Sequence, residues 1–337
     1  MEDSAWRRLF FLGAFLLLLS CATIPRGRLG VHKHEALYNR TKALALVEYA
    51  SAVYIVDDAS LLAWNCSRCQ GVNKDFKIHT LIVDVQHCLQ AFVGVAENLN
   101  SVVVAFRGTQ KTSMQNWVED LYFKELDLNY PGVTDAMVHR GFYAAYHNTT
   151  LREQVVTAVQ RIQQDRSELR VTITGHSMGG AMAAFCALDL TANYGVKDIE
   201  VYTFGQPRLG NAAFAAFYIA TVPRTIRVTH EHDLVVHLPP YYPRMGQKTY
   251  HHFPNEVWLI KVSVDRMHYE FEQMCDSTGE DIYCSRSVLG NSVADHLNYY
   301  GVYLRTVDNV LALNSDSANS NSSLASQALG YCRTTSS

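Results

Sequence analysis

The sequence predicts an α/β fold in which a mostly parallel central sheet carries helices on both faces. From residue 143 to residue 262, segments with helical periodicity alternate with strand-like runs, as parallel sheets with crossover helices require. Three strand-like runs follow one another before residue 107, so the first part of the sheet is expected to be antiparallel or mixed. A glycine-rich turn also joins one strand-like run directly to the next helical segment.

Each element is placed by its own pattern of apolar residues. Helical spacing predicts an N-terminal helix lying against the main domain and four later helices, at residues 38–54, 143–164, 181–194, 211–220 and 295–310. Strand-like runs fall at residues 79–85, 89–95, 101–106, 170–174, 199–204, 225–229 and 257–262. Residues 313–337 are rich in Ser, Asn and Ala, so we expect a disordered tail there.

Length and charge favour one domain, over residues 33–312, that does not bind nucleic acid. A chain of 337 residues is within reach of a single large domain. Its 29 basic and 32 acidic residues give a net charge of −3. Binding to nucleic acid depends on concentrated Lys and Arg, so this balance gives no electrostatic case for such a partner.

The N-terminus has the pattern of a secretory signal peptide. Arg7 and Arg8 precede an apolar run from Leu9 to Leu19, and small residues follow it. The run is short for a membrane-spanning helix, which needs roughly 20 residues, although a retained signal anchor is the alternative. We therefore expect residues 1–22 to be a signal peptide, and the protein to be secreted or held in the secretory-pathway lumen with at most peripheral membrane contact.

The cysteines fit an oxidising compartment. The pair Cys66 and Cys69 brackets a short polar turn, and Cys275 and Cys284 enclose an acidic loop, so both pairs look like local disulfides. A C-x-x-C pair could instead be redox-active or half of a metal site, but no second one accompanies it. An odd number of cysteines remains after the signal peptide, which leaves at least one thiol free: Cys88, Cys186 and Cys332. Four sequons for N-glycosylation, consistent with secretion, begin at Asn39, Asn65, Asn148 and Asn321.

The strongest motif is the hexapeptide Gly-His-Ser-Met-Gly-Gly at residues 175–180, which stands between a strand-like run and a helical segment. A serine hydroxyl becomes a useful nucleophile when it is lifted clear of the backbone and hydrogen-bonded to a base. The flanking glycines permit the strained turn that lifts it, and the new helix points its N-terminal amides at developing negative charge. Ser177 is therefore the predicted nucleophile, and a glycine-rich loop of purely structural value is the alternative.

A nucleophile on such a turn predicts that its partners follow in the order serine, acid, histidine. Asp233 lies just after the strand-like run 225–229, where the acid is expected, and Glu231 is a close rival. His296 stands at the start of the final helical segment and is the predicted base. The rival base, His268, lies on a polar stretch much sooner after its strand.

Negative charge that develops on the substrate oxygen requires two hydrogen-bond donors. One donor is expected to be the backbone amide of Met178, the residue after the nucleophile. The second is expected from the loop after an earlier strand, and the run 101–106 ends at Gly-Thr, which places Thr109 there. Its hydroxyl could fix the loop or donate beside its amide.

As a set, these segments resemble the class 3, or fungal-type, lipases. The resemblance runs from about Ala91 to Val310 and rests on motifs in one order, at residues 106–109, 116–117, 138–142, 175–180, 203–210, 237–240 and 295–301. In letters these are FRGT, NW, VHRGF, GHSMGG, TFGQPRLG, HLPP and DHLNYYG.

The family implies an α/β-hydrolase fold, a triad and two disulfides. By resemblance, Ser177, Asp233 and His296 form the triad, while Thr109 and Met178 form the oxyanion hole. The pairs Cys66–Cys69 and Cys275–Cys284 also look like disulfides of that family. The chain departs from the family in lacking an obvious partner that would tie Cys332 to the N-terminal helix, and Cys88 is the nearest candidate.

The family also carries a short helical lid after the first oxyanion residue, and the sequence supports one independently. Met114, Trp117, Val118 and Leu121 fall at positions i, i+3, i+4 and i+7, which makes an apolar stripe on a helix. Such a helix can cover a site when closed and meet lipid when open. An ordinary surface helix packed on the core is the alternative.

The resemblance implies hydrolysis of carboxylic esters of glycerolipids, of the triacylglycerol type, at a lipid–water interface and without a cofactor. A feruloyl-type esterase, a phospholipase A1-like enzyme and a catalytically inactive lipase-like binding protein are the alternatives on the same fold. A metal enzyme belongs to another class, with zinc ligands drawn from His230, Glu231, His232, Asp233 and His237. Neighbouring strand residues point to opposite faces, however, and such a site would leave the glycine-rich turn unexplained.

Overall fold

The structure is a computed structural model that describes residues 37–109, 114–264 and 267–305. The expected signal peptide at 1–22, the tail at 313–337, the sequon at Asn321 and Cys332 lie outside these ranges. Among the helices within them, none combines the length and the apolar character needed to cross a bilayer.

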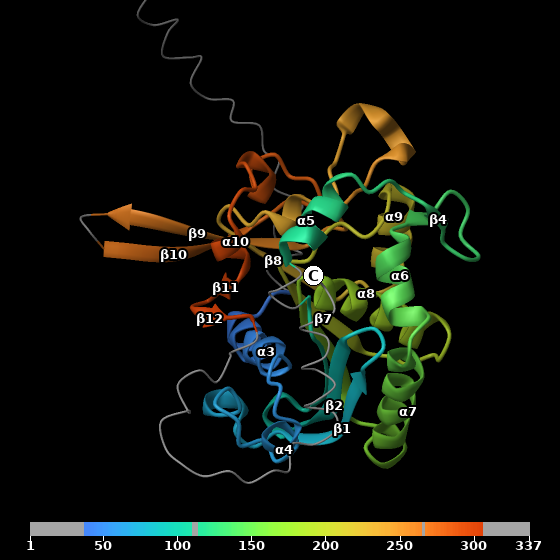
Figure 1. Ribbon diagram of the computed structural model, residues 1–337, viewed down its shortest axis with the longest axis vertical. Helices are drawn as coiled ribbons and strands as arrows, with labels where there is room; N and C mark the ends of the chain where they lie inside the picture. Colours follow the sequence, from blue (N-terminus) through green and yellow to red (C-terminus); the bar gives the residue numbers. More distant parts are fainter. Residues whose placement is uncertain (1–36, 110–113, 265–266, 306–337) are drawn as a thin grey trace, which may run out of the picture.

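An eight-stranded sheet forms the centre of the fold (Figure 1), in the order β1-β2-β3-β6-β7-β8-β9-β10. Strands β1, β2 and β3 pair antiparallel, the strands from β3 to β9 pair parallel, and β10 returns antiparallel to β9. The first part, expected to be antiparallel or mixed, is antiparallel, and the expected parallel centre is confirmed. The strands are β1 (Lys77–Asp84), β2 (Leu89–Ala96), β3 (Ser101–Phe106), β6 (Arg170–His176), β7 (Ile199–Phe204), β8 (Thr225–His230), β9 (Glu256–Val264) and β10 (Met267–Met274).

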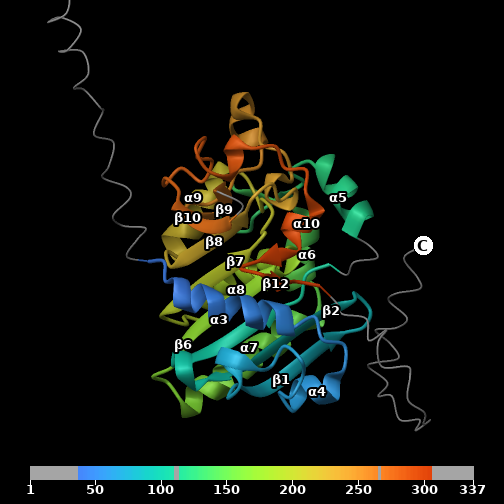
Figure 2. The same ribbon diagram turned by 90° about the vertical axis from the view of Figure 1, so that its left-hand side faces the viewer.

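Helices cover both faces of this sheet, as Figures 1 and 2 show. Helix α3 packs on one face, and α7 and α8 pack on the other with α6 and α9 beside them. Strand β3 is buried on both sides, because Val102 and Val104 point into one core and Val103 and Ala105 into the other. The helices are α3 (Arg40–Ala52), α4 (Asp58–Leu62), α5 (Met114–Tyr122), α6 (Arg140–His147), α7 (Thr150–Asp165), α8 (Met178–Ala192), α9 (Ala212–Thr221) and α10 (Val293–His296).

The single helix predicted at 143–164 is wrong, because two helices occupy this region. Helix α6 ends at His147, and α7 begins at Thr150. Thr149 caps α7, since its hydroxyl accepts a hydrogen bond from the amide of Leu151. Threonine competes for backbone amides in this way and so starts a new helix inside an apolar pattern that continues across the break.

The closing helix predicted at 295–310 is also wrong over the described residues. Helix α10 ends at His296, and a small hairpin follows, with β11 (Asn298–Tyr299) paired to β12 (Val302–Tyr303). Tyr300 and Gly301 join them with φ values of 54° and 78°. Positive φ at both central residues matches the twist of a two-residue hairpin, which a helix cannot accommodate.

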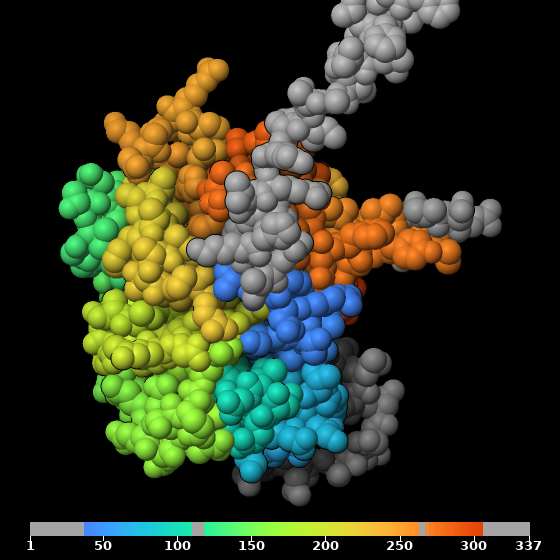
Figure 3. All heavy atoms as spheres, turned by 180° about the vertical axis from the view of Figure 1, so that it is seen from behind, coloured from blue at the N-terminus to red at the C-terminus, as the bar shows by residue number. Residues whose placement is uncertain are grey.

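Strand β10 is a further element, which was not predicted from the sequence. It pairs with β9 in a hairpin that projects from the body of the molecule (Figures 1 and 3). Charged residues alternate with apolar ones along it, so that Glu270 and Glu272 alternate with Tyr269 and Phe271. This alternation is typical of an edge strand with one polar face, but it interrupts the continuous apolar run by which the central strands were predicted.

Two disulfides close local loops, Cys66–Cys69 and Cys275–Cys284. Cys88 is also disulfide-bonded. Cys186 lies in α8 as a buried free thiol, where it packs as a small apolar residue. The described disulfides agree with the expectation of an oxidising compartment.

A buried carboxylate joins the three helices on one side of the sheet. Asp189 of α8 accepts hydrogen bonds from Arg152 of α7, at 2.8 and 3.0 Å, and from the hydroxyl of Tyr146 of α6, at 3.1 Å. Burial alone would raise the pKa of Asp189, but the hydrogen bonds from Arg152 and Asn193 outweigh it and hold that pKa below its usual value.

We predict that Asp189→Asn lowers the free energy of unfolding at pH 7 by about 2 kcal/mol, because the Arg152 guanidinium loses its charged partner. The lowered pKa stabilises the parent above the pKa of an unfolded aspartate, about 3.9, and this stabilisation is lost as the pH falls through the folded value. Urea unfolding at pH 7 and pH 3 measures both effects. Asp165→Asn, at the exposed end of α7, is the control and should change neither. Equal stability of the two variants at pH 7 would contradict the assignment.

Candidate active site

Ser177 stands at the junction between β6 and α8, where the sequence placed the nucleophile. Its φ and ψ are 58° and −128°, a strained conformation for a residue with a side chain. The turn is held because the Ser177 amide donates to the carbonyl of Phe204 on the neighbouring strand, at 2.9 Å. Side chains are excluded at the flanking glycines: a Cβ on Gly175 would lie 2.3 Å from the carbonyl oxygen of Gly179. The local sequence therefore permits the sharp turn that carries Ser177 between β6 and α8.

Asp233 lies on the loop that follows β8, two strands away from β6. Its carboxylate is fully buried and accepts a hydrogen bond from the amide of Val235 at 2.7 Å. The Asp233 backbone also forms a bridge with Ser292, which brings the loop against the start of α10. That contact places the aspartate next to the helix that carries the histidine.

His296 ends α10 and meets this carboxylate directly. The Nδ1 atom of His296 lies 2.9 and 3.0 Å from the two oxygens of Asp233, and its side chain is 1% exposed. Tyr299 donates its hydroxyl to Oδ2 of Asp233 at 2.5 Å. The structure thus brings Asp233 and His296 into contact, while the role of Tyr299 was not predicted from the sequence. The sequence feature that pointed to it was a tyrosine three residues after His296, in a motif where several side chains could serve as the donor to Asp233.

The electrostatics keep the Asp233 carboxylate charged. Burial opposes the charge, but the adjacent His296 ring and the hydrogen bonds from His296, Tyr299 and Val235 hold the pKa of Asp233 below its usual value. Burial and the nearby Asp233 charge raise the pKa of Tyr299 well above 10. Tyr299 therefore remains a neutral donor, and Asp233 remains an anion that can orient and stabilise an imidazolium.

Two buried polar atoms in this site have no hydrogen-bond partner among the described residues, Oγ of Ser177 and Nε2 of His296. Both side chains are almost fully buried. An unsatisfied buried polar atom costs free energy and calls for an explanation. A nucleophile and a base whose mutual contact tightens when substrate is bound provide one.

The loop after β3 lies against the nucleophile. Arg107 is buried and anchors the loop by donating to Oε1 of Gln90 at 2.8 Å and to the carbonyl of Cys88 at 2.7 Å. A Cβ on Gly108 would lie 3.1 Å from Cβ of Ser177, so this backbone passes directly beside the serine. Thr109 follows, with Oγ1 at 3.8 Å from Sδ of Met178. Thr109 and Met178 are therefore neighbours next to Ser177, as an oxyanion site requires.

Helix α5 lies beside α10 at this end of the molecule in both Figure 1 and Figure 2. Val118 and Leu121 on α5 are buried among the apolar side chains of the larger core. The side chains of Met114 and Trp117, the other two residues of the expected stripe, lie outside the described part of the chain. The described half of the stripe faces the protein interior, which fits both the expected lid and the alternative, a surface helix packed on the core.

The rival acid and base are placed differently. The Glu231 side chain is turned toward the amide of Lys261 on β9, away from His296. His268 belongs to the edge strand β10, and its side chain is outside the described residues. Of the two carboxylates near the end of β8, Asp233 is the one that contacts His296.

The alternative zinc site does not assemble. His230, His232 and His237 each direct Nδ1 at a different backbone carbonyl, those of Asp295, Leu289 and Asp233, at 3.0, 3.2 and 2.9 Å. Among the described side chains, the group whose spacing could suit a metal is Cys275, Asp281 and Cys284. Two of those three are joined in a disulfide.

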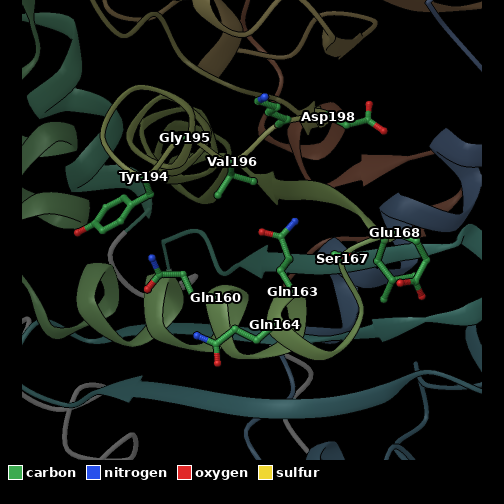
Figure 4. A pocket seen from close by; sticks show the side chains of 11 residues that line it. Gln160, Gln163, Gln164, Ser167, Glu168, Tyr194, Gly195, Val196 and Asp198 are labelled. Carbon is green, nitrogen blue, oxygen red and sulfur yellow. The ribbon is translucent and has the colours of Figure 1, made fainter.

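A surface hollow of about 540 Å³ (Figure 4) lies away from Ser177, Asp233 and His296. It is lined by Gln160, Gln163 and Gln164 of α7 and by the residues from Tyr194 to Asp198 that precede β7. The hollow therefore sits at the amino ends of β6 and β7, whereas Ser177 follows the carboxyl end of β6. Ligands of open α/β sheets bind beyond the carboxyl ends of the strands, so the hollow is not part of this site.

Comparison with known proteins identifies relatives of the whole arrangement. Residues 103–242 match the family model for lipases of class 3. A lipase of Rhizomucor miehei is 34% identical over 247 residues, which cover 71% of this chain and 62% of that protein. A Caenorhabditis elegans lipase is 30% identical over 319 residues, covering 86% of each chain. A secreted mono- and diacylglycerol lipase of Fusarium solani is 28% identical over 284 residues, covering 80% of each.

A solved structure extends the similarity to three dimensions. Rhizomucor miehei triacylglyceride lipase matches with a TM-score of 0.67 at 31% identity, covering 80% of this chain and 98% of that one. The expected α/β-hydrolase fold is thereby confirmed. The chain spans about six tenths of the length of the Rhizomucor and Rhizopus sequences it matches, 62% and 58%.

We predict that Gly205→Ala impairs this site through a direct contact. Gly205 has a φ of 60°, and a Cβ there would lie 2.9 Å from both Oδ2 of Asp233 and Nδ1 of His296. Displacing these groups should slow the reaction of Ser177 with a phosphonate ester by about 100-fold. Gly195→Ala is the control, since Gly195 has a similar φ of 66° but no atom near an added Cβ. Equal labelling rates for both variants would mean that only backbone strain matters.

A second prediction concerns the hydroxyl of Tyr299. Tyr299→Phe keeps the ring but removes the hydrogen bond that helps to hold the pKa of Asp233 low. At pH 7 the reactivity of Ser177 should fall about tenfold, because the Asp233 carboxylate loses one of the contacts that hold it against His296. The pKa of Asp233 should also rise, so reactivity should be lost at a higher pH on the acid side than in the parent. Phosphonate labelling rates between pH 3 and pH 8 measure both changes. If the labelling rate fell at the same pH on the acid side in the parent and the variant, Tyr299 would only fill space.

Proposed function

The chain belongs to the class 3 lipase family, and on that premise we propose that it hydrolyses carboxylic ester bonds of glycerolipids. The observation that carries the proposal is the buried contact between Asp233, on the loop after β8, and His296, at the end of α10. Chain order, burial and charge all suit a serine, histidine and aspartate that act as one unit.

The proposed mechanism assigns one role to each side chain. His296 takes the proton of Ser177 through Nε2 as the serine oxygen attacks the ester carbonyl, and Asp233 holds the ring by Nδ1 and stabilises its positive charge. The alcohol leaves with that proton, and an acyl group remains on Ser177. Water then gives a proton to His296 as its oxygen attacks the acyl group, and that proton passes to the oxygen of Ser177 as the fatty acid leaves. These steps need no metal or organic cofactor.

The oxyanion hole in this proposal consists of Thr109 and the amide of Met178. Met178 opens α8, so its N–H is one of the helix-terminal amides that have no partner within the helix. Thr109 adds a second donor, on the loop anchored by Arg107. Donors that are fixed before the reaction stabilise the developing charge without having to reorganise.

A lipid rather than a small soluble ester is proposed as the substrate, with α5 as the lid. Beside α5 lies a hollow of about 590 Å³. Its rim exposes large apolar side chains, which the surface of a soluble protein usually keeps scattered: Tyr122, Phe123, Tyr242 and Met245. Opening of α5 would add Val118 and Leu121 to this surface and uncover Ser177. A lipid–water interface is therefore the partner that we propose.

The proposal extends to the whole polypeptide. Residues 1–22 act as a signal peptide, residues 33–312 form the hydrolase domain, and residues 313–337 form a tail. Secretion is supported by the described disulfides and by the secreted Fusarium solani relative. Three sequons begin at exposed asparagines, Asn39, Asn65 and Asn148, which makes them accessible to glycosylation. The fourth, at Asn321, is proposed on sequence alone.

Hydrolysis of three substrates tests the proposal: emulsified triacylglycerol, a soluble short-chain ester and a phospholipid. We predict that the mature protein hydrolyses triacylglycerol at a rate that rises sharply above the solubility limit, because the interface favours the open position of α5. Ser177→Ala should lower the rate by about 10⁴-fold or more, because it removes the nucleophile.

Each other outcome selects an alternative. Turnover of the soluble ester with none of the emulsion would indicate a feruloyl-type or other esterase, and preference for phospholipid would indicate a phospholipase A1-like enzyme. A parent protein as inert as Ser177→Ala on all three substrates would indicate a lipase-like binding protein. Gly195→Ala serves as a handling control with unchanged activity.

A further inference from the structure

A buried tyrosine outside all the sequence motifs touches two parts of the proposed catalytic machinery. Tyr54 lies two residues after α3, and its hydroxyl oxygen accepts a hydrogen bond from the amide of Gly108 at 3.1 Å. The same oxygen lies 2.8 Å from Nδ1 of His176. On its other side, His176 places Nε2 at 2.8 Å from the backbone carbonyl of His296. One unbroken series of hydrogen bonds thus runs from the loop after β3, residues 107–109 (the oxyanion loop), to the backbone of His296.

The two ends of this series of hydrogen bonds decide which atom donates in each of them. The amide of Gly108 can only donate, so the Tyr54 oxygen accepts there and directs its own proton at Nδ1 of His176. The carbonyl of His296 can only accept, so Nε2 of His176 carries a proton and donates it. Both requirements are met by one neutral tautomer of His176. Every donor in this series of hydrogen bonds therefore has one acceptor, and no alternative arrangement of the protons satisfies all of them.

The surroundings favour this neutral arrangement. Tyr54 and His176 are fully buried, and burial with the nearby His296 ring lowers the pKa of His176 well below its usual value. Burial also raises the pKa of Tyr54, so its hydroxyl keeps its proton. Space is equally restricted, since a Cβ on Gly108 would lie 2.4 Å from the Tyr54 oxygen and 2.5 Å from the carbonyl of His176.

We infer that Tyr54 and His176 are positioning residues that fix the oxyanion loop and His296 relative to each other. Gly108 immediately precedes Thr109, and His176 immediately precedes Ser177. The hydrogen bonds through Tyr54 and His176 therefore connect the proposed nucleophile, the proposed base and one oxyanion donor. These groups otherwise come from separate segments of the sheet edge. A shift of about 1 Å between them would misalign the attack even if each group were intact. The inference rests on the proposed hydrolase function.

Tyr54→Phe tests the inference with little change in packing. The variant removes the hydroxyl and leaves the Gly108 amide and Nδ1 of His176 without a partner. We expect kcat on a soluble short-chain ester to fall about 10- to 100-fold, with KM nearly unchanged, because binding contacts are kept while alignment is lost. Titration with a phosphonate ester to completion should count the same number of reactive Ser177 groups as in the parent.

Tyr49→Phe is the matched control. Tyr49 lies on α3 and is equally buried, but its hydroxyl has no hydrogen-bond partner among the described residues. Its removal should leave kcat and KM unchanged. If both variants lost activity equally, the effect would come from disturbing the packing of α3, and the inference would be overturned.

A double-mutant cycle separates positioning from a general structural role. Tyr54→Phe and Thr109→Ala should be coupled, so that the fold-loss caused by the second change is about threefold smaller when the first is already present. A structural role alone would make the two effects multiply, which contradicts the inference. Nitrogen NMR of the His176 ring adds a readout that needs no variant: one neutral tautomer, protonated at Nε2, should persist below about pH 6.5, where an ordinary histidine takes up a second proton. The opposite tautomer would also overturn it.

Failure of the inference is distinguishable from failure of the proposed function. If the parent and Ser177→Ala were equally inactive, the hydrolase proposal itself would fail. If the parent were active and depended on Ser177, while Tyr54→Phe matched it in kcat, only the positioning role would fail.

Discussion

The charge on Asp233 is the constraint around which this end of the molecule is organised. A carboxylate with no exposure to solvent is costly unless every oxygen is satisfied, and here a ring nitrogen, a phenolic hydroxyl and a backbone amide share that task. These donors come from two separate segments, so the charge draws the loop after β8 and the α10–β11 region together. Gly205 leaves room for their contact because it carries no side chain.

Much of the fold was predictable because it depends on local patterns. A strand buried on both faces needs a run of apolar residues, and a nucleophile turn needs glycines at fixed positions, so β3, β6 and the place of Ser177 followed from the sequence. The predicted helices failed where one polar residue redirects the backbone. Thr149 starts a new helix inside a continuing apolar pattern, and the left-handed residues Tyr300 and Gly301 turn a hairpin where a helix was expected.

The parts of the site that escaped prediction are contacts between distant segments. Tyr54 is one of 19 tyrosines, and nothing in its immediate neighbours distinguishes it from tyrosines that only fill the core, while Tyr299 shares its motif with a second tyrosine, Tyr300. What distinguishes them is the partner, since one hydroxyl meets Asp233 and the other meets Gly108 and His176. Local patterns predict which residue types lie at the carboxyl edge of the sheet, whereas register and packing decide which of them touch.

In the proposed function, access to Ser177 and the alignment of its partners depend on different elements. The described hydrogen bonds that align Asp233, His296 and the oxyanion loop come from the sheet edge, from α10 and its hairpin, and from the segment after α3. Helix α5 instead contributes buried apolar side chains, Val118 and Leu121. Apolar contacts are non-directional and can be exchanged for contact with lipid, whereas the hydrogen bonds cannot be broken without leaving buried groups unsatisfied. The proposed lid, held in this way, can move while the groups held by hydrogen bonds stay aligned.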